Sequence, residues 1–238
     1  MVKEELVQRS PVRVFMNSID GGLEKGELGL IASPSGIGKT SMLVQIALDR
    51  LLQGKKVIHV SFTRHNDYVL SWYRDIFDEF IKKKNLENEQ DVKNDLVKNR
   101  VLMRFTQEGV PVEQILKSLK VMIGEGAFKA DGIITDGLNF TAADRDRISK
   151  VKAFAAEMGV SVWYSCNVQG EEPLYDKRNI PLVIKDYEDL FEVIVRMEPK
   201  QTHIALSVSK NRKVYNPDHA AMKLDPKTLL IMESQDFT

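Results

Sequence analysis

Ser33-Pro34-Ser35-Gly36-Ile37-Gly38-Lys39-Thr40 is a glycine-rich segment that ends in glycine, lysine and threonine. The apolar run at 28–32 comes directly before it and is typical of a short buried strand. After it, apolar residues recur at helical spacing through 41–52, which predicts an amphipathic helix. A strand, a glycine-rich turn and a helix in this order are typical of loops that bind phosphate groups. The segment therefore predicts a phosphate site inside an α/β fold.

The residue types in this loop explain how it would bind a nucleotide. Gly36 and Gly38 let the backbone curl so that its N–H groups converge on phosphate oxygens, and the helix N-terminus adds partial positive charge. We expect Lys39 to contact the β and γ phosphates and the Thr40 hydroxyl to ligate Mg²⁺. The predicted ligands are therefore a nucleotide, bound through its phosphates, and Mg²⁺. The predicted nucleotide-binding residues are Ser35, Gly36, Ile37, Gly38, Lys39, Thr40 and Ser41.

The composition of the 238 residues fits a globular nucleotide-binding domain. The chain is 43% hydrophobic and 29% charged, so it can bury a sizeable core. Its formal net charge of zero argues against a dedicated nucleic-acid binder, and no apolar run approaches the roughly 20 residues of a membrane span. The single cysteine, Cys166, excludes an intrachain disulfide and fits a reducing compartment. We therefore expect a cytoplasmic protein that has no contact with a membrane.

Strand-like and helix-like segments alternate along the chain. Apolar runs predict four further strands, at 57–62, 101–105, 133–136 and 160–165. Amphipathic patterns predict helices through 69–81, 111–123 and about 142–158. This alternation predicts a mainly parallel sheet with helices on both faces.

The C-terminal third has a different pattern. Consecutive strand-like runs occur at 191–197, 204–208 and 222–232, the last of them broken by the turn 225–227. They predict an antiparallel extension of the sheet. We expect one domain over 1–238, with a core at about 15–215 and a C-terminal β-hairpin at about 216–234.

Asp136 is the predicted acidic partner of the loop. It ends the apolar run 132–135, so we expect a buried strand to hold its carboxylate near the phosphate site. An aspartate in that place can bind Mg²⁺ through water, together with Thr40. Lys39 and Asp136 are therefore the predicted catalytic residues. A purely structural role for Asp136, capping the strand before Gly137, is the alternative.

The lead-in Gly21-Gly22-Leu23-Glu24-Lys25-Gly26-Glu27-Leu28 extends this pattern upstream. It resembles the start of RecA-like P-loop ATPases of the KaiC type. The loop itself, in which Ser33 stands where the usual pattern begins with glycine, is similar to that of DnaB-type hexameric helicases. The resemblance covers about residues 15–215 and implies a RecA-like core that binds ATP.

Lys210-Asn211-Arg212 follows the strand-like run 204–208. It resembles the Lys-x-Arg element that both groups place at a subunit boundary, where it reaches the γ-phosphate held by the neighbouring subunit. The resemblance implies trans contacts by Lys210 and Arg212 and a homo-oligomer, either a ring or a filament. An ordinary basic loop after a strand is the alternative.

One departure from these families concerns hydrolysis. They end the second core strand with one or two glutamates that activate the attacking water, and the alignment puts Thr63 and Arg64 there. Neither residue can act as a general base at neutral pH. Asp67 is about three residues away from the required position. Glu108 or Asp144 are further alternatives that the sequence leaves open.

A polar segment follows the predicted strand at 160–165. The resemblance implies that Asn167 or Gln169 senses the γ-phosphate, and a simple polar loop is the alternative. The stretch 170–186 then stands where RecA-like proteins carry a DNA-facing loop, but its acidic and basic residues balance. Because nucleic-acid affinity depends on an excess of basic residues, we expect this loop to be a poor DNA groove.

Together these features predict an ATP-binding RecA/KaiC-like protein with weak or conditional ATPase activity that assembles with ATP at its subunit interfaces. A nucleotide-gated scaffold or regulatory module without significant hydrolysis, acting on an unknown protein partner, is the first alternative. A helicase or recombinase motor acting on DNA is a weaker one.

Overall fold

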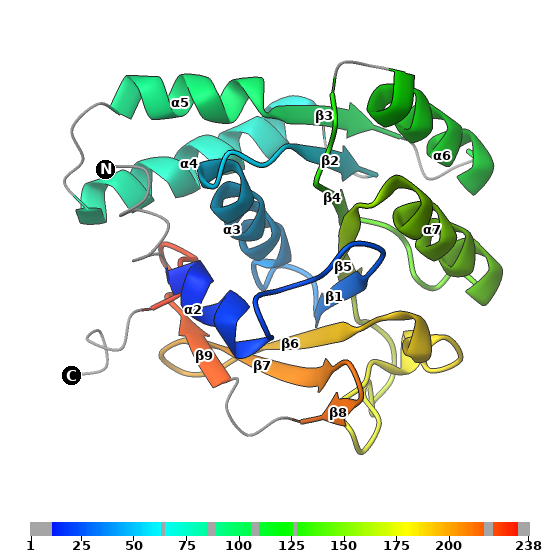
Figure 1. Ribbon diagram of the computed structural model, residues 1–238. Helices are drawn as coiled ribbons and strands as arrows, with labels where there is room; N and C mark the ends of the chain where they lie inside the picture. The colour runs from blue at the N-terminus through cyan, green and yellow to red at the C-terminus, as the bar shows by residue number, and fades with distance from the viewer. Residues whose placement is uncertain are drawn as a thin grey trace.

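The computed structural model describes residues 11–62, 65–84, 89–105, 110–125, 128–216 and 221–232 (Figure 1). The helices are α2 Pro11–Ser18, α3 Lys39–Leu52, α4 Asn66–Lys84, α5 Glu89–Lys98, α6 Val112–Lys120 and α7 Arg145–Met158. A π-helical turn, Val121–Glu125, follows α6. The strands are β1 Leu28–Ser33, β2 Val57–Ser61, β3 Arg100–Arg104, β4 Gly132–Asp136, β5 Ser161–Asn167, β6 Val193–Pro199, β7 Ile204–Asn211, β8 Val214–Tyr215 and β9 Ala221–Leu224.

One mixed sheet organises the molecule. Its strand order is β3-β2-β4-β5-β1-β6-β7-β8, and β9 pairs with β7. The strands from β3 to β6 in this order are parallel, whereas β7 is antiparallel to β6, β8 and β9. This arrangement confirms the predicted fold class, a mainly parallel α/β sheet with an antiparallel C-terminal extension.

Two hydrophobic cores lie on opposite faces of the sheet. Helices α2 to α5 contribute to one core, and α6 and α7 contribute to the other. Figure 1 shows α3 and α7 on opposite sides of the central strands. All six residues of β1 are buried, as expected for a parallel strand covered on both faces. The apolar runs of the sequence therefore mark the strands well.

Gly29 allows β1 to occupy the centre of the sheet. A Cβ atom at this position would lie 2.6 Å from ring carbons of Trp163 on β5. That spacing is shorter than any tolerable carbon contact, so the indole packs on bare backbone. The glycine inside the apolar run 28–32 thus reflects a close approach of β5.

The predicted strand positions agree with the structure to within two residues for β2 to β5. Helices α2 and α5 were not predicted. The stretch containing α5 is largely polar, and only Val92 and Leu96 bury a face of it. At the C-terminus the run 222–232 forms the short strand β9, a turn, and a single bridge between Leu224 and Ile231.

Candidate functional site

The loop after β1 lies at a change of direction in the sheet. Strand β1 sits between β5 and β6, so the chain leaves it toward β2 on one side and returns later as β6 on the other. In open parallel sheets, ligands bind in the crevice outside the carboxyl ends of the strands at such a point. The glycine-rich segment 33–38 occupies this position.

The loop has the backbone conformation that its glycines permit. Gly36 has φ 81° and Gly38 has φ 100°, both in the left-handed region. A Cβ at Gly36 would meet nothing within 4 Å, so the backbone conformation and not a lack of space favours glycine there. Gly38 caps α3, which begins at Lys39. The N-terminus of a long helix is therefore directed at the loop, as anion binding requires.

Lys39 folds back over the loop and makes four hydrogen bonds. Its Nζ donates to the Ser33 carbonyl at 3.0 Å, the Ser33 hydroxyl at 3.1 Å, the Pro34 carbonyl at 2.7 Å and Asn167 Oδ1 at 3.4 Å. All four acceptors are neutral oxygens. Burial lowers the pKa of Lys39 to about 8, although Cys166 and Asp136 oppose this shift. The site thus holds a partly buried ammonium group that no carboxylate of the described residues contacts directly.

Thr40 and Asp136, the predicted metal ligands, lie side by side. Thr40 Oγ1 donates to Asp136 Oδ2 at 2.9 Å, and Asp136 is only 5% exposed. The other carboxylate oxygen accepts from Ser165 Oγ at 2.5 Å, and the Gly137 N–H donates to Ser165 Oγ at 2.9 Å. Hydroxyl and carboxylate oxygens are the donors that Mg²⁺ prefers, so these residues fit the predicted ion.

An open pocket of about 670 Å³ surrounds the loop. Its size is within the range of small-molecule sites. Its lining includes the loop, the ends of β4 and β5, and side chains from α4 and the C-terminal turn. The lining residues are Ser35, Gly36, Gly38, Lys39, Thr40, Tyr68, Trp72, Asp136, Gly137, Leu138, Asn139, Phe140, Ser165, Asn167, Gln169 and Leu229.

Several of these residues were missed by sequence reasoning. Tyr68 and Trp72 come from α4, and their rings meet edge to face with centroids 6.2 Å apart. Tyr68 is 40% exposed, so an aromatic surface faces the pocket. Their i, i+4 spacing was a usable signal. Leu229 and Ser165 gave no such local signal, because tertiary contacts alone bring them here.

The predicted sensor residues lie at the pocket. Asn167 contacts Lys39, and its Nδ2 donates to Gln169 Oε1 at 3.2 Å. Two other predicted nucleotide-binding residues are placed differently. Ile37 packs partly buried against the hydrophobic core, and Ser41 is fully buried with its hydroxyl donating to the Leu229 carbonyl at 3.0 Å. The Ser41 side chain is therefore engaged with the C-terminal turn and does not face the pocket.

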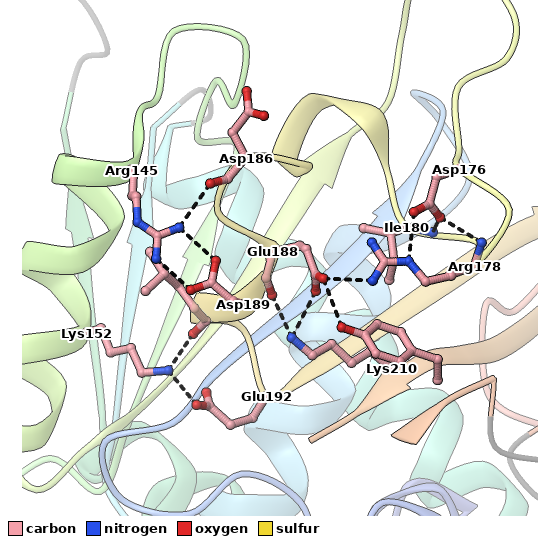
Figure 2. A network of polar contacts seen from close by, with 12 residues as sticks. Arg145, Lys152, Asp176, Arg178, Ile180, Asp186, Glu188, Asp189, Glu192 and Lys210 are labelled. Atoms are coloured by element: carbon pink, nitrogen blue, oxygen red, sulfur yellow. Dashed lines mark hydrogen bonds and ion pairs between the residues drawn. The ribbon is translucent and has the colours of Figure 1, made fainter. Parts of the chain in front are cut away.

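Lys210 is bound within its own chain (Figure 2). Its Nζ donates to the Glu188 carbonyl at 2.8 Å and to Glu188 Oε2 at 3.0 Å, and the residue is 5% exposed. Arg178 and Tyr215 contact the other carboxylate oxygen at 3.1 and 2.9 Å. Burial would raise the pKa of Glu188, but the hydrogen bonds from Lys210 and Tyr215 bring it below its ordinary value.

Arg212 is likewise engaged within the chain. It sits at φ 53° in the turn after β7, and its guanidinium contacts Glu27 at 3.1 and 3.2 Å and Asp20 at 3.3 Å. It also donates to the Gly22 carbonyl at 3.3 Å. Neither Lys210 nor Arg212 lines the pocket. A trans contact by Lys210 would require a buried ion pair to break, and one by Arg212 would require it to leave the Gly-Gly-Leu lead-in.

The structure places two of the three candidate general bases, Asp67 and Asp144. The third candidate, Glu108, lies outside the described residues, as do Thr63 and Arg64, which stand at the positions of the missing glutamates. Asp67 pairs with His65 at 3.1 Å, and Asp144 caps α7 by accepting from the Arg147 N–H at 2.8 Å. Among the described residues that line the pocket, Asp136 is the one carboxylate.

Arg178, in the stretch 170–186, and Arg145, on α7, are paired with acidic residues of the same chain. Arg178 pairs with Asp176 and Glu188, and Arg145 forms a bidentate pair with Asp189 just after this stretch (Figure 2). Both guanidinium groups are thus bound to carboxylates of the same chain.

Among the helices of the described residues, none combines the length and the apolar character that a membrane span needs.

Comparison with known proteins gives a limited likeness to a DNA repair protein. No model of a protein family matches the chain. A 45-residue stretch, 19% of the chain, is 53% identical to the DNA repair protein RadA of Aquifex aeolicus (strain VF5). That stretch corresponds to only 10% of the length of RadA. The match and the mainly parallel α/β sheet are compatible with a RecA-like fold.

Proposed function

We propose that this protein binds ATP with Mg²⁺ at the loop after β1 and hydrolyses it weakly or conditionally. The observation that carries the proposal is the environment of Lys39: a partly buried ammonium group held by neutral oxygens, next to the Thr40–Asp136 pair. Removing a cation from water is costly unless an anion compensates it. A phosphate group would supply that anion, and the α3 N-terminus and the loop N–H groups would add to its binding.

The proposal of weak hydrolysis rests on the shortage of carboxylates. Asp136 is expected to serve the metal ion, and it is the one carboxylate in the described pocket lining. General-base assistance is worth roughly 10²–10⁴ in rate. Without a second carboxylate, the site would bind ATP well and turn it over slowly.

A nucleotide-gated module that acts on a partner protein is the second candidate function. The cis contacts of Lys210 and Arg212 favour it, because they leave the site without a cation from a neighbouring copy. Assembly into a homo-oligomer would then require Arg212 to exchange Glu27 for the γ-phosphate of the next subunit. A DNA-directed motor has the RadA match in its favour but lacks an excess of basic residues.

Asp136 provides the test of the metal site. Calorimetric titration with ATP should give tight binding in the presence of Mg²⁺ and weaker binding in EDTA. Asp136→Asn should weaken binding with Mg²⁺ more than binding without it. Equal losses under both conditions would leave Asp136 a purely structural role.

Turnover tests the proposal that a missing general base makes hydrolysis weak. We expect the wild type to hydrolyse ATP well below about 1 s⁻¹, the low end of common enzyme rates. Thr63→Glu should raise this rate, with Arg64→Glu as its companion because the alignment fixes the position only to within one residue. Fast turnover in the wild type and no gain in either variant would show that another residue is the base. Titration of labelled single-stranded DNA, with and without ATP, tests the motor alternative.

A further inference from the structure

The C-terminal turn Asp225–Ile231 contacts the phosphate loop directly. A Cβ atom built at Gly38 would lie 3.3 Å from Leu229 Cδ2 and 3.8 Å from Met197 Cε. The Leu229 side chain therefore supports the flank of the loop where it joins α3. Leu229 also lines the pocket, so one side chain touches both the loop and the space that the ligand would enter.

Two polar side chains of α3 hold this turn in place. The Leu229 carbonyl accepts from Ser41 Oγ at 3.0 Å and from Gln45 Nε2 at 2.8 Å. Gln45 Oε1 in turn accepts from the Ile231 N–H at 3.2 Å, so one amide group binds the turn at two points. Ser41 and Gln45 are 0% and 4% exposed. If the turn moved away, these buried polar groups would lose their hydrogen-bond partners, which costs free energy. The hydrogen bonds therefore favour this one position of the turn.

The turn holds Leu229 in an unusual conformation. Its φ is 55°, in the left-handed region that residues with a Cβ adopt at a cost. Asp225 maintains this geometry. Its carbonyl accepts from the Leu229 N–H at 2.8 Å, and its carboxylate accepts from the N–H groups of Lys227 and Thr228 at 2.6 and 3.2 Å. Strain of this kind persists where the surroundings fix it, and it often accompanies ligand sites.

Helix α3, which binds the turn, also carries the two residues that are proposed to bind phosphate and metal. Lys39 and Thr40 directly precede Ser41, and both have contacts that must change when a phosphate and a metal ion arrive. Lys39 must leave Ser33 and Pro34, and Thr40 must leave Asp136. Ser41, Gln45 and the Leu229–Gly38 contact thus connect the start of α3 to the turn, so an adjustment at one would reach the other.

We propose that the turn Asp225–Ile231 is a latch that preorganises the phosphate loop, with Leu229 as the positioning residue. This inference rests on the proposed nucleotide function and concerns its phosphate part. Because coupling between two sites is reciprocal, a bound phosphate chain must stabilise the closed latch by the same factor that the latch adds to phosphate binding. Residues remote in sequence from the loop thus control its affinity for anions.

Leu229→Gly separates the two parts of the latch. Glycine removes the side chain that supports Gly38, yet it suits φ 55° and keeps the turn folded. Leu229→Ala removes most of the same side chain but keeps the strained backbone. Leu182→Ala, which alters a partly exposed leucine outside the pocket, is the matched control. Thermal melts of the ligand-free variants establish that each is folded.

The probes are magnesium tripolyphosphate, which lacks a nucleoside, and magnesium ATP. Calorimetry should show both binding about tenfold more weakly to Leu229→Gly and to Leu229→Ala, within the usual range for coupled sites. The control should match the wild type. Hydrogen exchange should show slower exchange of the Leu229 and Ile231 amides when tripolyphosphate binds the wild type.

Three outcomes would overturn the proposal, each in a different way. A loss confined to ATP would make Leu229 a wall for the nucleoside. Unchanged binding of both ligands, or unchanged exchange at 225–231, would remove the latch while leaving the nucleotide function intact. If the wild type binds neither ligand at millimolar concentration, the nucleotide function fails and the latch fails with it.

Discussion

Two lysines in this protein are withdrawn from water in opposite ways. Lys39, in the phosphate loop, is held by neutral carbonyl, hydroxyl and amide oxygens. Lys210, on β7, contacts the carboxylate of Glu188. The same carboxylate forms an ion pair with Arg178 and accepts a hydrogen bond from Tyr215. A buried cation that is paired with a carboxylate is neutralised and serves the fold. A cation that is surrounded by neutral acceptors keeps its full charge, so it can still attract an incoming anion. The charge of the acceptors therefore distinguishes a lysine that stabilises the fold from one that is suited to bind a ligand.

The largest effect should come from breaking the neutralised site. Glu188→Gln leaves the Lys210 ammonium group buried without its counter-charge, so we expect the free energy of unfolding to fall by about 3 kcal/mol. Urea denaturation of the ligand-free protein measures this loss. The double variant Glu188→Gln/Lys210→Met should recover much of it, because it removes the stranded charge. A fall below 1 kcal/mol in the single variant would contradict the assignment of this pair as a buried one.

Lys39→Ala should have the reverse profile. Lys39 is partly desolvated, and within the described ranges its ammonium group contacts neutral oxygens and no carboxylate, so its removal should not lower the stability of the ligand-free protein. The stabilisation by ATP·Mg²⁺ should be lost, however, and this amounts to about 2.7 kcal/mol when ATP is present at 100 times its Kd. Thermal melts with and without ATP measure both quantities. A full ATP-induced shift in Lys39→Ala would mean that the loop is not the phosphate site.

The acidity of Lys39 gives a sharper test of the same contrast. Burial lowers its pKa in the ligand-free protein to about 8. We expect the protonated form to be the one that binds phosphate. Affinity for ATP should therefore be constant below pH 7 and about tenfold weaker at pH 9, where roughly a tenth of the lysine is charged. Calorimetry across this range measures the change. Lys39→Arg stays charged throughout and should show a flat profile.

The same group affects stability with the opposite sign. The unfolded chain holds the Lys39 proton up to pH 10.5, whereas the folded chain releases it from about pH 8. The contribution of Lys39 to the free energy of unfolding of the ligand-free protein should therefore rise with pH within this window. A contribution that instead falls with pH there would mean that a carboxylate stabilises the ammonium group.

Arg212→Ala should cost less stability than Glu188→Gln. This arginine is partly exposed and binds Glu27 and Asp20, so its loss should cost about 1 kcal/mol. If it also serves a neighbouring subunit, ATP·Mg²⁺ should increase the mass of the wild type but not that of the variant. Light scattering at tens of micromolar measures this. A strictly monomeric wild type with ATP bound would restrict Arg212 to its contacts with the lead-in.

How much the sequence could predict depended on how local each signal is. The loop 33–40 and its flanking strand and helix form one continuous stretch of sequence, so their pattern could be recognised locally. Asp136 could be recognised because it ends an apolar run. Leu229 is different, because its neighbour Gly38 is remote in sequence and only the sheet brings them together. The partner of Lys210 was hidden for the same reason, since Glu188 precedes it by a loop and a strand.

The position of β1 in the sheet has a consequence for how the chain acquires its site. Leu28 and Gly29 pair with Val162 and Val193, so both neighbours of β1 in the sheet, β5 and β6, lie far along the chain from it. Contacts between residues so distant along the chain are slow to form. Until they form, an unpaired apolar strand is prone to aggregate. The glycine-rich loop directly follows β1. During synthesis on the ribosome, the loop can therefore reach its final position in the sheet only after β5 and β6 have been made.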